Sequence, residues 1–210
     1  MDYLEACLTL ENYKDHIAWI ESVLYCKDWS LKSRLAQLLV CFPNEHAKKM
    51  LLQLLRDSNE LVQVEALDSL ASFPSEGTFD AVITHLTSRH PLVRSYTYLC
   101  IGEICPKEKR EEVLLSLQEI TEKNTNSKIG LLFCLVQLGE RDKINDLLKM
   151  ISRCNYRNKI EILNSFEYYW DDYTKEEKDN IYQAIKKRDF SKEGRAVRTA
   201  LEQFFLLKIE

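Results

Sequence analysis

Glycine and proline are scarce in this sequence, which has 5 Gly and 4 Pro among 210 residues. Hairpin turns, phosphate-binding loops and tight strand connections depend on these residues, because glycine reaches positive φ and proline fixes a turn. Their scarcity therefore disfavours β-rich folds and nucleotide-binding loops. It favours helices, since 45% apolar residues suffice for a substantial core.

An excess of positive charge and long apolar runs are also missing. The 29 Lys and Arg residues are outnumbered by 33 Asp and Glu residues, which leaves a net charge of -4. This balance disfavours nonspecific binding of nucleic acid, so we do not expect nucleic acid as a partner. No stretch reaches membrane-spanning length, and the start of the chain lacks the basic and apolar regions of a signal peptide. We predict a cytoplasmic protein that does not contact a membrane.

Motifs for catalysis and for metal or cofactor binding are absent as well. The sequence contains no nucleophile elbow, phosphate loop, paired metal-binding histidines or dinucleotide fingerprint at the required spacing. The four histidines are isolated from one another, and the seven cysteines lack zinc-site or thiol-redox spacing. We predict no metal, no cofactor and no enzymatic activity.

A near-periodic series of helix breakers runs through the chain. Pro43, Pro74, Pro106 and Gly139 are separated by 31, 32 and 33 residues, and a similar step leads to Asp171. Before each breaker, apolar residues recur at steps of three and four, as in Leu35, Leu38, Leu39 and Phe42. A second apolar-striped segment follows each breaker. The unit is therefore a helical hairpin, and successive hairpins must stack to bury their stripes.

This periodicity predicts an all-α protein with one domain, a right-handed α-solenoid of about five hairpins over residues 1–210. The expected repeats are about 28–56, 57–87, 88–121, 124–152 and 155–188, with an N-terminal cap of about 1–27 and a C-terminal cap of about 191–210.

The second and third units carry a more specific pattern. It consists of Asp57, Leu61-Val62-Gln63, Ala66 and Leu70, and then Pro91-Leu92-Val93-Arg94, Ile101-Gly102 and Ile104. These segments resemble the HEAT and HEAT-like repeat family, although Gln63 and Thr97 stand where the family has Arg and Ala. The resemblance implies an open, curved solenoid that binds partners along its surfaces, and it fixes no single function.

Two enzyme families with similar helical repeats are alternatives, the alkylpurine DNA glycosylases and the bilin lyases. A glycosylase needs a basic concave face, but the basic cluster of this chain is confined to the C-terminal end, within 186–198. No bilin-binding signature accompanies the repeats. Both enzyme classes therefore rank below a binding function.

Two features are candidate binding surfaces. The first is an aromatic and acidic segment at the last turn, with the candidate residues Tyr168, Trp170, Asp171, Asp172 and Tyr173. Tyrosine and tryptophan beside carboxylates are typical of interface anchors, whereas packing between the last repeats is the alternative.

The second candidate surface is an acidic strip. Residues 57–105 contain seven acids and two arginines, and the candidate residues are Asp57, Glu60, Glu65 and Asp68. Solvation of exposed helix faces is one explanation for such a strip, and recognition of a basic partner is the other.

We therefore predict a non-catalytic scaffold or adaptor that binds another protein, and the acidic strip favours a basic one. The alternative is a bacterial immunity protein that binds and neutralises a basic toxin nuclease, because an acidic surface with aromatic anchors can imitate phosphates and stacked bases.

Overall fold

The computed structural model describes residues 13–206. Parts of both predicted caps, residues 1–12 and 207–210, lie outside the described residues. The described chain is helical throughout and has no strand, with the elements α2 (Tyr13–Val23), α3 (Trp29–Leu39), α4 (Glu45–Leu54), α5 (Glu60–Leu70), α6 (Glu76–Ile83), η1 (Thr84–Thr87), α7 (Pro91–Ile104), η2 (Lys107–Lys109), α8 (Arg110–Gln118), α9 (Thr125–Leu138), α10 (Lys143–Ile151), α11 (Tyr156–Tyr168), η3 (Trp170–Asp172), α12 (Lys175–Lys186) and α13 (Arg195–Leu206).

The starts of most helices are fixed by side-chain caps. Short polar side chains accept hydrogen bonds from first-turn N–H groups at Asp28, Asn44, Asn59, Ser75, Asn124, Asn155 and Thr174. Pro91 opens α7, where its missing N–H costs nothing, and Gly139 ends α9 at φ 124°. These caps define the hairpins.

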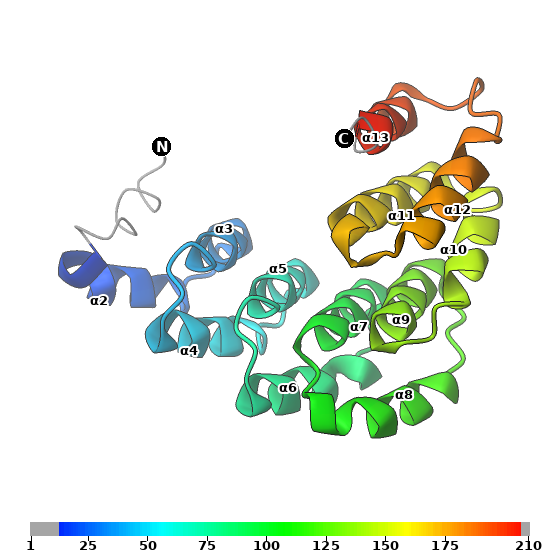
Figure 1. Ribbon diagram of the computed structural model, residues 1–210. Helices are drawn as coiled ribbons and strands as arrows, with labels where there is room; N and C mark the ends of the chain where they lie inside the picture. The colour runs from blue at the N-terminus through cyan, green and yellow to red at the C-terminus, as the bar shows by residue number, and fades with distance from the viewer. Residues whose placement is uncertain (1–12, 207–210) are drawn as a thin grey trace.

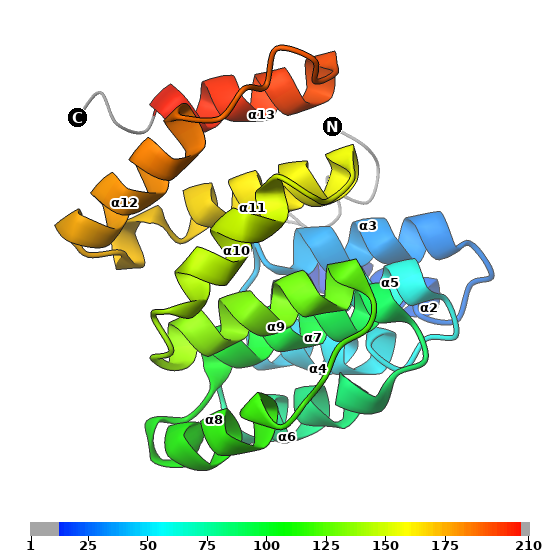
Figure 2. The ribbon, with the colours of Figure 1, turned by 90° about the vertical axis from the view of Figure 1, so that its right-hand side faces the viewer.

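The hairpins stack into a curved α-solenoid. In Figure 1, α3, α5, α7, α9, α11 and α13 line the inner side of the arc, and α4, α6 and α8 lie on its outer side. Figure 2 shows α7 and α9 side by side, with α8 below them and α11 above. The prediction of an all-helical α-solenoid is confirmed.

The interior consists of two cores that share α9. The N-terminal core joins α2–α8 to Leu131, Cys134, Leu135 and Leu138 of α9. The C-terminal core joins α10–α13 to Ile129, Leu132, Phe133 and Val136 of the same helix. The α9 sequence contains a single charged residue, Lys128, and ten of its 14 residues are buried. A helix that is apolar on nearly all sides can be covered on nearly all sides.

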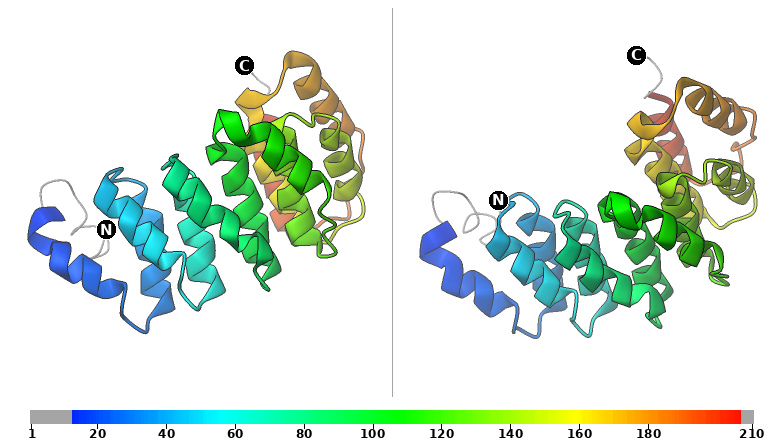
Figure 3. Two further views of the ribbon diagram at one scale, coloured as in Figure 1. Left: turned by 90° about the horizontal axis from the view of Figure 1, so that it is seen from below. Right: turned by 60° about the horizontal axis from the view of Figure 1, so that its bottom comes forward.

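Figure 3 shows the hairpins from α3 to α8 as a regular row, whereas α11, α12 and α13 turn out of that row. This turn brings α11 over α7 as well as α9. Ser95 of α7 donates a hydrogen bond to Glu161 of α11 at 3.2 Å, and Tyr169, just after α11, donates one to Glu103 of α7 at 2.9 Å. The space on the inner side of the arc is therefore narrower where α5, α7 and α11 meet.

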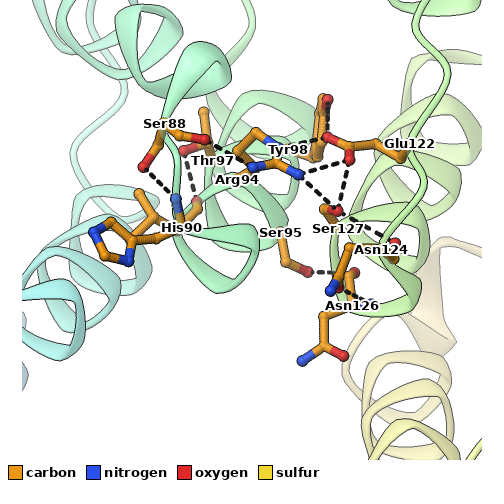
Figure 4. Close-up of polar contacts among 11 residues, drawn as sticks. Ser88, His90, Arg94, Ser95, Thr97, Tyr98, Glu122, Asn124, Asn126 and Ser127 are labelled. Carbon is orange, nitrogen blue, oxygen red and sulfur yellow. Dashed lines mark hydrogen bonds and ion pairs between the residues drawn. The ribbon is translucent and has the colours of Figure 1, made fainter.

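An ionic network fixes the connection between α8 and α9. Figure 4 shows Arg94 and Glu122 at its centre, with Nε–Oε1 and Nη2–Oε2 distances of 2.7 and 2.9 Å. The Tyr98 hydroxyl and the Ser127 hydroxyl donate to the same carboxylate at 2.9 and 2.7 Å. The bond to Arg94 outweighs the effect of burial and lowers the pKa of Glu122 to about 2.

Candidate functional site

Two acids of the predicted strip form local contacts. Asp57 lies 2.6 Å from the Lys32 ammonium and accepts a hydrogen bond from the Asn59 N–H at 2.8 Å. Burial raises the pKa of Asp57, but these contacts outweigh it and the pKa is lowered. Glu60 lies 2.9 Å from Nδ1 of His90, at the start of the next unit. Both side chains connect neighbouring repeats.

Two further acids of the strip face a lysine on the outer side. Glu76 and Asp80 of α6 lie 3.0 and 3.3 Å from the Lys109 ammonium. Four of the seven acids in the strip are therefore matched by a basic or titratable partner nearby.

The other three acids, Glu65, Asp68 and Glu103, form no ion pair with any described residue. Burial raises the pKa of all three, most simply in Asp68, where it is the sole cause. The negative charge of Asp68 also raises the pKa of Glu65 and Glu103, so the three carboxylates share one electrostatic environment.

Two of these carboxylates, Asp68 and Glu103, border a cavity of about 220 Å³ between α5, α7 and α11, and Glu65 lies nearby. Its walls include Asp68, Glu103 and the rings of Tyr96, Tyr168 and Tyr169. Because all three helices belong to the inner layer, the cavity opens on the concave side of the arc (Figure 1). We call it the acidic cavity. Burial, followed by the charge of Asp68, raises the pKa of Tyr96 to about 12.

Tyr168 is the most exposed ring of this site. Its side chain is 70% exposed, and it packs edge-on against Tyr169 with ring centroids 4.8 Å apart. The Tyr169 hydroxyl is fixed on Glu103, whereas the Tyr168 hydroxyl lies 3.5 Å from the other oxygen of that carboxylate. A large exposed ring beside unpaired carboxylates is the arrangement typical of an interface anchor.

The structure separates the other members of the predicted aromatic segment. Trp170 packs edge-on against Phe204 at 5.4 Å, and Tyr173 is buried, so both rings belong to the C-terminal core. Asp171 and Asp172 are exposed at the turn, and Asp171 lies 3.8 Å from the Lys178 ammonium. Of the predicted site residues, the acidic cavity brings together Tyr168, Asp68 and the nearby Glu65.

Two acids near the acidic cavity were missed as candidates. Glu103 is the last acid of the strip, but no spacing in the sequence distinguishes it from its neighbours. Glu161 comes from α11, far along the chain, and burial raises its pKa to about 7 against the hydrogen bond from Ser95. Its approach to α7 depends on the turn of the last hairpins, which the repeat pattern does not contain.

Other chemistry is sparse over the part of the chain that the structure describes. Residues 13–206 contain no group of three or more His, Cys, Asp or Glu side chains arranged to hold a metal ion. The six cysteines in this range are free thiols. No helix in this range is long and apolar enough to cross a membrane.

Comparisons with known proteins agree with the helical repeats. The similar solved structures include the crystal structure of an engineered protein, 17% identical over 98% of each chain with a TM-score of 0.38, and no conclusion follows from so loose a superposition. No curated protein matches the sequence. Residues 47–129, from α4 to the first part of α9, match the family model of HEAT repeats, so the predicted HEAT-like character is confirmed for this segment.

Proposed function

We propose that this protein is a non-catalytic scaffold or adaptor that binds a partner protein in its concave face, at the acidic cavity. The observation that carries this proposal is the set of three carboxylates, Glu65, Asp68 and Glu103, that have no basic partner among the described residues. HEAT repeats generally serve as protein-interaction scaffolds, which agrees with this role.

The charges favour a basic partner. Burial raises the pKa of all three carboxylates, and repulsion by Asp68 raises the pKa of Glu65 and Glu103 further, so keeping them ionised costs free energy. A lysine or arginine side chain from a partner would relieve this repulsion, and Tyr168 offers an exposed ring for apolar or cation–π contact. Binding should therefore weaken as the salt concentration rises.

A more specific form of the proposal is an immunity protein that neutralises a basic toxin nuclease. Carboxylates beside an exposed ring can occupy a nucleic-acid cleft in place of phosphates and bases. Inhibition of a captured nuclease would distinguish this form from an adaptor, which would leave its partner active.

The enzyme alternatives receive less support. A glycosylase that wraps DNA needs positive charge on its concave face, and the acidic cavity would repel phosphates. The predicted basic cluster lies at the end of α12, the following loop and the start of α13, at the C-terminal end of the solenoid (Figure 2).

The test compares two variants with equal charge changes. In the first, Glu65→Gln, Asp68→Asn and Glu103→Gln neutralise the acidic cavity. In the control, Glu111→Gln, Glu119→Gln and Glu176→Gln neutralise three exposed acids elsewhere. Tagged parent and both variants are used to capture proteins from the native lysate, and the affinity for each captured protein is then measured by titration calorimetry at two salt concentrations.

We expect the first variant to lose at least about tenfold in affinity, while the control keeps the parent's affinity. The proposal fails if the two variants lose affinity equally, or if a partner binds all three proteins alike.

A further inference from the structure

A second, larger cavity lies along the edge of the solenoid where the turns of successive hairpins meet. It has a volume of about 600 Å³ and is walled by the last turns of α7, α9 and α11, the start of α8 and η3. This volume lies within the range of small-molecule sites, about 300–1,000 Å³. We call it the turn cavity. It shares a wall with the acidic cavity at Glu103, Tyr168 and Tyr169.

Three polar atoms of the turn cavity are buried without a hydrogen-bond partner. They are Nε of Arg110, Oε1 of Gln137 and the hydroxyl oxygen of Tyr173. The Tyr173 side chain is only 4% exposed, so its hydroxyl cannot turn to bulk water. Each such atom costs about 1–3 kcal/mol when left unsatisfied. The other buried side-chain atoms of this kind are scattered over the described chain, and only this cavity collects three of them.

The walls of the turn cavity also carry opposite charges that do not meet. Arg110 forms no ion pair with a described residue, and Glu103 has only tyrosine hydroxyls as partners. By contrast, the charge of Arg141 is already matched, because its guanidinium makes two hydrogen bonds of 2.6 and 2.7 Å to Glu177. Arg110 therefore remains available to a negative group of a ligand, and the carboxylates of Glu103 and of Asp172, which forms no ion pair with a described residue, remain available to a positive one.

The position of the Gln137 amide depends on a glycine. A Cβ atom at Gly102 would lie 1.7 Å from Oε1 of Gln137, so the amide oxygen fills the space that any other residue would occupy. The sequence thus lets an acceptor lie against the backbone of α7, beside Glu103.

We propose that the turn cavity binds a small zwitterion, an α-amino acid, with its carboxylate at Arg110 and Tyr173 and its ammonium group at Gln137 Oε1 and Glu103. Such a ligand supplies an acceptor for each unpartnered donor and a donor for each unpartnered acceptor. Arg110 lies in the first turn of α8 on a long, half-buried side chain, which can turn toward an entering carboxylate. This proposal does not rest on the proposed protein-binding function, although the two sites share Glu103, Tyr168 and Tyr169.

The experiment titrates the standard amino acids individually into the full chain, followed by amide NMR shifts and thermal unfolding. Each amino acid that binds is compared with its N-acetyl derivative, which lacks the ammonium group, and with its carboxamide, which lacks the carboxylate. The variants are Tyr173→Phe and Arg110→Gln, and the control is Tyr156→Phe, which removes an exposed hydroxyl elsewhere.

We expect at least one amino acid to bind, and both blocked forms to bind about tenfold more weakly or not at all. Tyr173→Phe and Arg110→Gln should each weaken binding about tenfold, the loss typical of one hydrogen bond to a charged group. In the absence of ligand, Tyr173→Phe should unfold at the same temperature as the parent or higher, because it removes a hydroxyl without a partner.

The proposal is overturned if no amino acid binds at millimolar concentration, if the blocked forms bind as well as the free amino acids, or if Tyr173→Phe and Arg110→Gln leave the affinity unchanged. Glu103 belongs to both sites, but Glu65 and Asp68 do not line the turn cavity, and Arg110 and Tyr173 do not line the acidic cavity. Variants at these four residues therefore test each proposal separately, and either can fail while the other holds.

Discussion

The two cores of this solenoid use different means to pack the same kind of hairpin. In the N-terminal core most buried residues are aliphatic or small, although Phe73, Phe79 and Tyr98 are buried there too, and Gly130 of α9 lets the backbone of α7 approach closely. The C-terminal core also contains many aliphatic residues, but it adds contacts between rings, such as Phe133 with Phe166 at 5.3 Å and Trp170 with Phe204 at 5.4 Å. Small residues give close, regular stacking, whereas large rings hold helices at less regular angles.

This difference coincides with a change in the direction of the solenoid. The HEAT match covers residues 47–129 and ends within α9, where the packing changes from small residues to rings. Beyond that point the hairpins turn out of the row, and α11 reaches α7 (Figure 3). The acidic cavity depends on that turn, because its walls come from both parts of the chain.

The largest effect should follow removal of the central ring of the C-terminal core. Phe133 is fully buried and contacts Phe166 and Tyr169. We expect Phe133→Ala to lower the free energy of unfolding by about 3–5 kcal/mol, because it removes a large apolar surface and leaves a cavity. Urea denaturation measures this loss.

The same variant tests whether the two cores fold together. Because Phe133 lies on the helix that both cores share, hydrogen exchange should become faster in α3–α6 as well as in α11–α13. The control is Leu51→Ala, at a fully buried site in α4, far from α9. If Phe133→Ala accelerates exchange only after α9, the two cores are independent units and the shared-helix model is wrong.

A smaller effect on stability is expected when the main ion pairs are broken, and the two pairs should differ from each other. Arg94–Glu122 and Arg141–Glu177 have similar geometry, and the arginine in each pair lowers the pKa of its glutamate to about 2. However, the Glu122 side chain is 6% exposed, whereas Glu177 and Arg141 are 19% and 35% exposed. We expect Glu122→Gln to cost about 3 kcal/mol near neutral pH, and Glu177→Gln to cost less than about 1 kcal/mol.

The pH dependence of the Glu122 pair follows from the direction of its shift. Its pKa is lower in the folded protein than in the unfolded chain, so its stabilising effect is present above about pH 4.5 and is lost as the pH falls toward 2. Between pH 7 and pH 3, the free energy of unfolding measured by urea denaturation should therefore fall less for Glu122→Gln than for the parent. If Glu122→Gln and Glu177→Gln lower the free energy of unfolding near neutral pH equally, the difference in burial does not make one ion pair more stabilising than the other.

The fold was largely predictable from the sequence, and the reasons lie in particular residues. Pro43, Pro74, Pro106 and Gly139 end the first helix of successive hairpins, and the stripes between them are buried as their spacing requires. These are local signals, because a helix breaker acts on its own segment and a stripe needs only a neighbouring helix. The angle between successive hairpins is not local, so the turn at α9 could not be predicted.

The candidate site was less predictable for the same reason. Asp68 and Tyr168 belong to different predicted features, and only the turn of α11 places them in one cavity. The sequence places seven acids in the strip, but it does not distinguish Asp57, which contacts Lys32, from Glu65, which contacts no cation among the described residues. The turn cavity gave no sequence signal at all, because Arg110, Gln137 and Tyr173 come from three separate hairpin turns.

The smallest effect concerns the close approach of α7 and α9, where two glycines can be compared. A Cβ atom at Gly130 would lie 2.4 Å from the carbonyl oxygen of Ser95, which is backbone and cannot move alone. At Gly102 the nearest atoms belong to the end of the Gln137 side chain, which can rotate away. Both substitutions gain helix propensity, worth up to about 1 kcal/mol.

We therefore expect Gly130→Ala to lower the free energy of unfolding by about 1–2 kcal/mol, since α7 and α9 must separate, and Gly102→Ala to change it by less than about 0.5 kcal/mol. Urea denaturation of the two variants measures the difference. If neither substitution changes the free energy of unfolding, α7 and α9 can move apart at little cost. Small residues then do not fix the regular stacking of the N-terminal core. If Gly130→Ala alone is costly, that contact is rigid, and the small residue fixes the distance between α7 and α9.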